Sequence, residues 1–257
     1  MHVTLSECGT VKRGPLLLRF VDFIDAAMVV AETPETGSVR TTLERWCDEA
    51  HWAVVLRGDA ELERDGVRVP LPPGSAFHVP SGPPSHRLVT SGRLIMAGMV
   101  PLAGRTGENG SLVAEDFGVV SPGVVRHEDE AAEPVVAKPN GTSVSLEEGR
   151  VLAEMAEMGE WIFTRVTFGP TSGYATSWCD AAHYGLVLRG TMAIEWENDV
   201  EVVGAGDVYH CPGGPPGHRL EVADSAVAVD FTPRAAFQAG KRVAGWRPTL
   251  LAASAAS

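Results

Sequence analysis

The sequence has too little positive charge for several classes of protein. It carries 33 Asp and Glu residues against 21 Lys and Arg residues, which gives a formal net charge of -12. Phosphate backbones and anionic lipid surfaces repel a chain of this charge. Nucleic acid and membranes are therefore not expected among its partners.

Long apolar segments are also missing. Residues 1–13 are polar, and the run Leu16-Leu17-Leu18 is too short for a signal peptide or a membrane span. The sequence therefore predicts a cytoplasmic protein. Cysteine is scarce as well, and the spacing of the four cysteines gives no disulfide framework, so thiols are expected in a reducing compartment. These residues are Cys8, Cys47, Cys179 and Cys211.

An internal repeat, by contrast, is clear at a fixed offset of 132 residues, as from Cys47 to Cys179. No gap is needed between Trp46 and Leu88, which indicates a duplicated unit. The recurring segments are Trp46-Cys47-Asp48-Glu49-Ala50-His51-Trp52 with Trp178-Cys179-Asp180-Ala181-Ala182-His183-Tyr184, Val55-Leu56-Arg57-Gly58 with Val187-Leu188-Arg189-Gly190, and Pro83-Pro84-Ser85-His86 with Pro215-Pro216-Gly217-His218.

Each repeat is typical of β structure. The apolar runs 53–56 and 185–188 stop near a glycine, as buried strands do, and Asp65-Gly66 is a hairpin turn signal. Ahead of the second repeat, Val151, Leu152, Met155 and Met158 have helical spacing, so a short helix is expected over 151–158.

The length of 257 residues suits two small domains. The segment 103–148 is Gly-rich at first and then acidic and Pro-containing, which is typical of a connection. We predict an N-terminal domain over 1–126 and a C-terminal domain over 127–257.

The repeat resembles the cupin superfamily, and the whole chain resembles the two-domain bicupins. Both copies of Val-Leu-Arg-Gly look like the end of the first cupin motif, and the segments 74–86 and 206–218 look like the second motif. The resemblance covers roughly residues 40–102 and 172–234. It implies an all-β fold of two tandem jelly-roll β-barrels related by internal duplication, with short helices.

The metal-binding positions of the family are altered in this chain. The first motif of the family supplies two histidines and then a glutamate, and the glutamate position holds His51 or His183. The second histidine position holds Cys47 or Cys179. A Cys-His-His set could replace the usual ligands in each barrel, and it comprises Cys47, His51 and His86 in the first repeat and Cys179, His183 and His218 in the second.

A thiolate with two imidazoles suits Zn²⁺ with a fourth position open to water or substrate, and iron is the other divalent metal considered. Cys47 and His51 would lie roughly 13 Å apart in one straight strand, so a turn must separate them. Two other interpretations stay open: a metal-free pocket lined by hydrogen-bonding histidines, and purely structural roles, since free cysteine is often buried. His78 and His210 are assigned to the pocket lining, with ordinary strand packing as the alternative.

These features favour a metal-dependent enzyme that acts on a small molecule by non-oxidative chemistry, of isomerase, cyclase or lyase type. The alternatives are a metal-free module that binds or senses a small ligand, and an iron-dependent dioxygenase. Because cupin barrels commonly pair, the two barrels are expected to pair within one chain, and a homodimer is left open.

Overall fold

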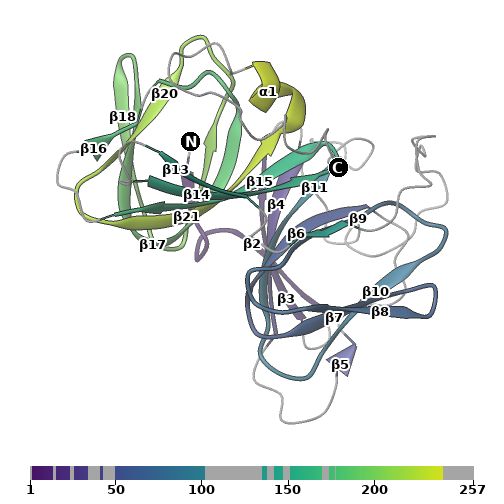
Figure 1. The fold of residues 1–257 in the computed structure, drawn as a ribbon. Helices are drawn as coiled ribbons and strands as arrows, with labels where there is room; N and C mark the ends of the chain where they lie inside the picture. Colours follow the sequence, from purple (N-terminus) through teal and green to yellow (C-terminus); the bar gives the residue numbers. More distant parts are fainter. Residues whose placement is uncertain are drawn as a thin grey trace, which may run out of the picture. The chain divides into compact units, whose positions relative to one another are not determined.

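The computed structural model describes residues 2–13, 16–23, 26–33, 41–42, 50–101, 135–137, 142–146, 151–169, 174–176 and 178–239. It divides into two compact units, one formed by residues 8–138 and the other by residues 1–7 and 139–257 (Figure 1). The predicted boundary between residues 126 and 127 lies outside the described residues. Pairing of the two barrels and homodimerisation stay predictions.

The N-terminal unit is built from antiparallel strands in two sheets. One sheet has the order β12-β9-β6-β11-β4-β3-β2 and the other the order β5-β10-β7-β8. The strands are β2 (Gly9–Arg13), β3 (Leu16–Asp22), β4 (Ala26–Glu32), β5 (Thr41–Thr42), β6 (His51–Arg57), β7 (Ala60–Arg64), β8 (Val67–Leu71), β9 (Ala76–Val79), β10 (His86–Thr90), β11 (Ile95–Pro101) and β12 (Val135–Ala137).

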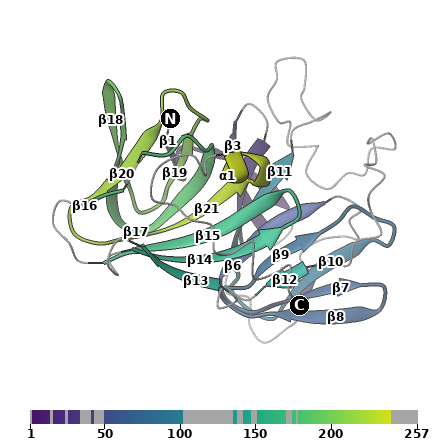
Figure 2. The ribbon, with the colours of Figure 1, turned by 45° about the horizontal axis from the view of Figure 1, so that its top comes forward.

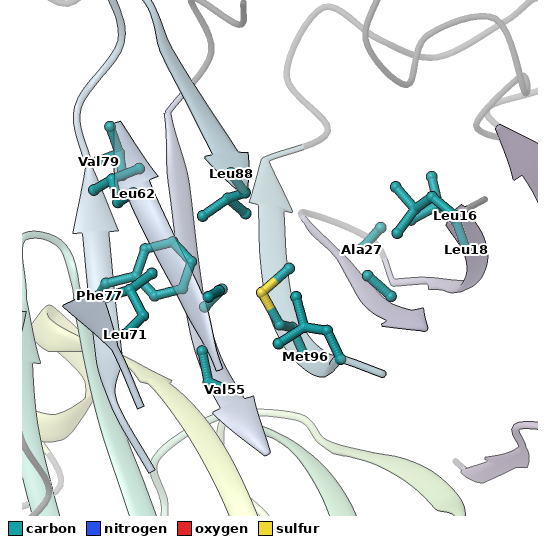
Figure 3. Packing of buried hydrophobic residues seen from close by; sticks show 14 residues of the cluster. Leu16, Leu18, Ala27, Val55, Leu62, Leu71, Phe77, Val79, Leu88 and Met96 are labelled. Atoms are coloured by element: carbon teal, nitrogen blue, oxygen red, sulfur yellow. The ribbon is translucent and has the colours of Figure 1, made fainter. Parts of the chain in front are cut away.

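The core of this unit lies between its two sheets. Phe77 and Val79 of one sheet point toward Leu62 and Leu88 of the other (Figure 3). Burying each such side chain contributes about 1.5–3 kcal/mol. The inward side of β6 includes Val55.

The C-terminal unit repeats this plan. Its main sheet has the order β1-β19-β17-β21-β15-β14-β13, while β18 and β20 pair with the distal part of β17, and β16 pairs with β20 (Figure 2). The elements are β1 (His2–Thr4), β13 (Thr142–Leu146), β14 (Val151–Met158), β15 (Trp161–Phe168), β16 (Tyr174–Ala175), β17 (His183–Trp196), β18 (Asp199–Gly204), β19 (Asp207–Cys211), β20 (His218–Val222), β21 (Ala226–Pro233) and α1 (Arg234–Ala239).

Each unit includes a strand from the other half of the chain. Strand β1 pairs with β19, so the first residues of the chain belong to the C-terminal unit. Strand β12 follows the long connection in sequence and pairs with β9 of the N-terminal unit. The C-terminal unit therefore contains the first seven residues of the chain, and the N-terminal unit extends to residue 138.

The predicted all-β jelly-roll fold is confirmed, and so is the Asp65-Gly66 hairpin. Both turn residues have positive φ, 51° and 74°, as a two-residue turn between β7 and β8 requires. Gly58 and Gly190 also have positive φ, and a Cβ at either would collide with a backbone carbonyl, of Arg93 or Ser225. These glycines let the chain pass closely beneath a neighbouring loop.

The helix predicted over residues 151–158 is wrong, because that segment is strand β14, paired with both β13 and β15. Val151, Ala153 and Met155 are buried while Leu152 is exposed, which is the alternation of a strand. Within the described ranges, no helix has the length and apolar character that a membrane crossing demands.

Candidate metal centre

The C-terminal site forms where β17 and β20 begin. His183 is the first residue of β17, and His218 is the first residue of β20. Cys179 is joined to His218 by a β-bridge, in which each backbone N–H donates to the other residue's carbonyl oxygen at 2.7 and 2.9 Å. The backbone of Cys179 is thereby held beside His218 and not in line with β17.

A tight turn brings Cys179 back toward His183. The carbonyl oxygen of Asp180 accepts a hydrogen bond from the Gly214 N–H at 2.9 Å. A Cβ at Gly214 or Gly217 would lie 2.6 Å from Asp180 Oδ1, so glycine at both positions leaves room for the Asp180 side chain. The turn that the sequence requires between the cysteine and the first histidine is therefore present in the C-terminal unit.

The three candidate ligands of this unit converge. The donor atoms of Cys179, His183 and His218 all lie within 4.8 Å of one another. Sγ of Cys179 is 3.3 Å from Nε2 of His183, and the rings of His183 and His218 are edge to face with centroids 5.2 Å apart. His218 is 2% exposed, and within the described residues its Nδ1 has no hydrogen-bond partner.

A second layer of polar residues lies behind His183. Its Nδ1 is 3.0 Å from Oδ1 of Asp230 and 2.9 Å from Oγ1 of Thr232, and the Thr232 hydroxyl also donates to Asp230 at 2.9 Å. The Tyr209 hydroxyl donates to the other carboxylate oxygen at 3.1 Å. This network places the imidazole proton on Nδ1 and leaves Nε2 facing the thiol.

These contacts alter the acidity of the site. Burial alone would lower the pKa of His183, but the charge and hydrogen bond of Asp230, together with Cys179, raise it to about 10. Burial likewise would raise the pKa of Cys179, yet His183 and the Ala181 N–H outweigh it, and the pKa is lowered. Burial and the charge of His183 lower the pKa of His218 to about 3. The cluster therefore makes the Cys179 thiol more acidic and the His183 ring more basic than usual.

The N-terminal unit brings His51 and His86 together in the same way. Their rings are edge to face, with centroids 5.0 Å apart. His86 is 1% exposed, burial lowers its pKa to about 3, and neither ring nitrogen has a hydrogen-bond partner among the described residues. Cys47, the third predicted ligand, lies outside the described residues.

The layer behind the histidine differs between the two units. In the register of the sheets, Gly185 lies opposite Asp230, as Ala53 lies opposite Gly98. The N-terminal positions equivalent to the second polar layer carry no side chain that forms hydrogen bonds. They are Phe77 for Tyr209, Gly98 for Asp230 and Val100 for Thr232.

His78 and His210, assigned to the pocket lining from the sequence, each stack on an aromatic ring. His78 stacks on Trp52 and His210 on Tyr184, with centroids 5.0 and 4.5 Å apart. Both histidines follow an inward-pointing residue of β9 or β19, so alternation directs them to the opposite face. The charge of His210 nevertheless contributes to the lowered pKa of His218, so the assignment of both histidines to the pocket lining stays a prediction.

Sequence reasoning missed the polar layer of Asp230, Thr232 and Tyr209. A signal was present, because Asp230 is the one charged residue in the largely apolar strand Ala226–Pro233, where a charge is unusual. A comparison of the two repeats selects positions that are the same in both copies. Asp230 was not selected, because the equivalent residue in the first copy is Gly98.

Comparison with known proteins supports the fold. No protein-family profile matches the sequence, and no curated protein sequence is significantly similar to it. Among solved structures, a mutant of Bacillus subtilis oxalate decarboxylase matches with a TM-score of 0.66 and 14% identity, over 91% of this chain and 77% of that one. A structure of the same enzyme, studied for its Mn(II) centres, matches with a TM-score of 0.65 and 16% identity over the same shares. The chain thus has the two-barrel fold of bicupins.

Proposed function

We propose that this protein is a metal-dependent enzyme that acts on a small molecule by non-oxidative chemistry. The observation that carries the proposal is the convergence of Cys179, His183 and His218, whose donor atoms lie within 4.8 Å of one another. Cys47, His51 and His86 are proposed as a second set of the same kind.

The donor set fits a transition metal. Thiolate and imidazole are the ligands that Zn²⁺ prefers, and three protein ligands leave a position for water or substrate. His183 already directs Nε2 toward the thiol and Nδ1 toward a carboxylate, the arrangement typical of a zinc-bound histidine. His218 keeps a buried ring nitrogen that has no partner in the described part of the chain.

The chain's own residues would divide the work at this site. Cys179, His183 and His218 would hold the ion, and Asp230 with Thr232 would keep the His183 ring in place. Bound Zn²⁺ would supply a Lewis acid that polarises a substrate oxygen. Because Zn²⁺ has no redox chemistry, isomerase, cyclase or lyase reactions suit the site, and the structurally similar oxalate decarboxylase also performs a lyase reaction.

Manganese and iron are the alternatives for the ion. The Mn(II) centres of the similar enzyme support a divalent metal in barrels of this fold. The donor set of this chain argues for zinc over manganese, because Mn²⁺ prefers oxygen ligands and a thiolate selects softer ions. Imidazole ligands also suit iron. An iron-dependent dioxygenase is therefore the alternative enzyme, and elemental analysis of the purified protein distinguishes it from a zinc enzyme.

The test is an elemental analysis of protein purified without a polyhistidine tag and without added metal. Stoichiometric zinc that falls in the Cys179→Ser variant would support the proposal, and zinc lost from the Cys47→Ser variant would extend it to the N-terminal set. Manganese or iron would correct the identity of the ion. Negligible metal, with equally small heats on calorimetric zinc titration of wild type and the double variant, would favour a metal-free binding module.

A further inference from the structure

We infer that Asp230 is the positioning residue of the C-terminal site, held in turn by Tyr209, and that this device belongs to the C-terminal barrel alone. The inference rests on the proposed metal site and deepens it. In this inference Asp230 orients the His183 ring, and it therefore contributes to the affinity of the site for its ion.

The first argument is burial. Asp230 is 6% exposed and lies in a strand of buried residues. A carboxylate at this depth is costly unless hydrogen bonds and a nearby positive charge compensate it. Each of its oxygens accepts a hydrogen bond, from Thr232 at Oδ1 and from Tyr209 at Oδ2, and the remaining contact is His183. Among the described residues, His183 is thus the one candidate ligand within hydrogen-bond distance of this carboxylate.

The second argument is steric. Tyr209 reaches Asp230 only because residue 185 is glycine, since a Cβ there would fall on the tyrosine ring. In the N-terminal unit the equivalent of Gly185 is Ala53, facing Gly98, and a Cβ at Gly98 would lie 3.0 Å from that of Ala53. The C-terminal barrel has room for Tyr209 and Asp230 at this place, and in the N-terminal barrel the Ala53 methyl group fills the equivalent space.

The two barrels therefore provide an internal control. Substituting Asp230 should affect only the C-terminal set, because its N-terminal equivalent is a glycine. The effect is measured in a His51→Ala parent, in which the N-terminal set has lost a ligand. Zn²⁺ affinity is determined by calorimetry after the protein has been stripped with a chelator.

In this parent, Asp230→Asn should weaken Zn²⁺ binding about 10- to 100-fold, the usual loss when a metal-bound histidine loses its hydrogen-bond acceptor. Tyr209→Phe, which copies Phe77 of the other barrel, should cause a smaller loss in the same direction. Asp207→Asn is the matched control and should leave the affinity unchanged. Its carboxylate accepts from Thr4 and from the Gly204 N–H, at the opposite end of β19 from Cys211.

A cobalt spectrum separates positioning from general damage. With Co²⁺ in place of Zn²⁺, Asp230→Asn should keep the thiolate-to-cobalt charge-transfer band, because Cys179 is untouched, while the ligand-field bands change as the imidazole turns. Identical spectra together with unchanged Zn²⁺ affinity in both Asp230→Asn and Tyr209→Phe would overturn the inference alone. Negligible binding by the His51→Ala parent, and by wild type, would overturn the proposed metal site and the inference with it.

Discussion

Nδ1 of His183 lies 3.0 Å from Oδ1 of Asp230, and this contact directs the opposite ring nitrogen, Nε2, to within 3.3 Å of Sγ of Cys179. A thiol, an imidazole and a carboxylate therefore form one hydrogen-bonded chain. In metal-free protein this arrangement lowers the pKa of the Cys179 thiol against the effect of burial, because the neighbouring His183 ring stabilises the negative sulfur.

The thiolate leads to a prediction about alkylation. In metal-free protein near neutral pH, iodoacetamide should modify Cys179 well before Cys211, which is 1% exposed and has a pKa raised by burial. Zn²⁺ should protect Cys179, because a thiolate bound to a metal is a weaker nucleophile. Peptide mass spectrometry at timed intervals measures both rates.

The control for this prediction is His183→Gln, which removes the imidazolium and should slow modification of Cys179 several-fold without affecting Cys211. Equal rates for Cys179 in wild type and in this variant would show that His183 does not activate the thiol. Protection by Mg²⁺ as strong as that by Zn²⁺ would show that the effect does not come from the sulfur ligand.

The repeated segments, together with their resemblance to the cupin motifs, were enough to predict the fold and the convergence of the second ligand set. Strands recur at the same offset, so β6 and β17 both begin at a candidate histidine, as do β10 and β20. The helix at 151–158 failed because Val151 and Met155 fit both a helical and an alternating pattern, and pairing with neighbouring strands decides between them.

The polar layer behind His183 could not be obtained in this way. Asp230 is 47 residues from His183 in sequence, and their contact depends on the pairing of β17 with β21. Gly185 gives no hint of its role until the Tyr209 ring is seen to fill the space beside it. Such contacts join residues that are far apart in sequence. Sequence periodicity indicates only on which face of a strand a side chain lies, and not which residue it contacts.

A second prediction concerns stability in acid. Burial lowers the pKa values of His86 and His218 to about 3 from an ordinary value of 6.5. Between these values the unfolded chain binds protons that the folded protein excludes, so the free energy of unfolding falls as the pH falls from 6.5 toward 3. The slope is about 1.4 kcal/mol per pH unit for each histidine. Urea unfolding of metal-free protein at several pH values in this window measures it.

The matched comparison for the acid prediction is the double variant His86→Phe and His218→Phe. Carboxylates also titrate in this window, so the difference in slope between wild type and variant isolates the histidines. A variant as acid-sensitive as wild type would mean that the two rings accept protons in the folded state.

A third prediction tests the space beside Tyr209. Gly185→Ala should lower the free energy of unfolding by about 1–3 kcal/mol, the usual cost of overpacking a core. The new methyl group would collide with the Tyr209 ring and push its hydroxyl away from Asp230. Gly92→Ala is the control, because nothing lies within 4 Å of a Cβ there, and it should be nearly neutral. Equal stability of the two variants would show that the Tyr209 ring has room to move.

The last prediction concerns His86 itself. Its ring is 1% exposed, and both ring nitrogens are without hydrogen-bond partners among the described residues, which costs about 1–3 kcal/mol for a buried polar group. His86→Phe should therefore match or exceed the unfolding free energy of wild type near pH 7 in the presence of a chelator. It should also lower the metal content of the N-terminal barrel, measured by elemental analysis in a Cys179→Ser background. A histidine that weakens the fold but holds an ion is expected at a binding site, where stability is given up for function. Marked destabilisation by His86→Phe, with metal content unchanged, would instead make His86 a structural residue.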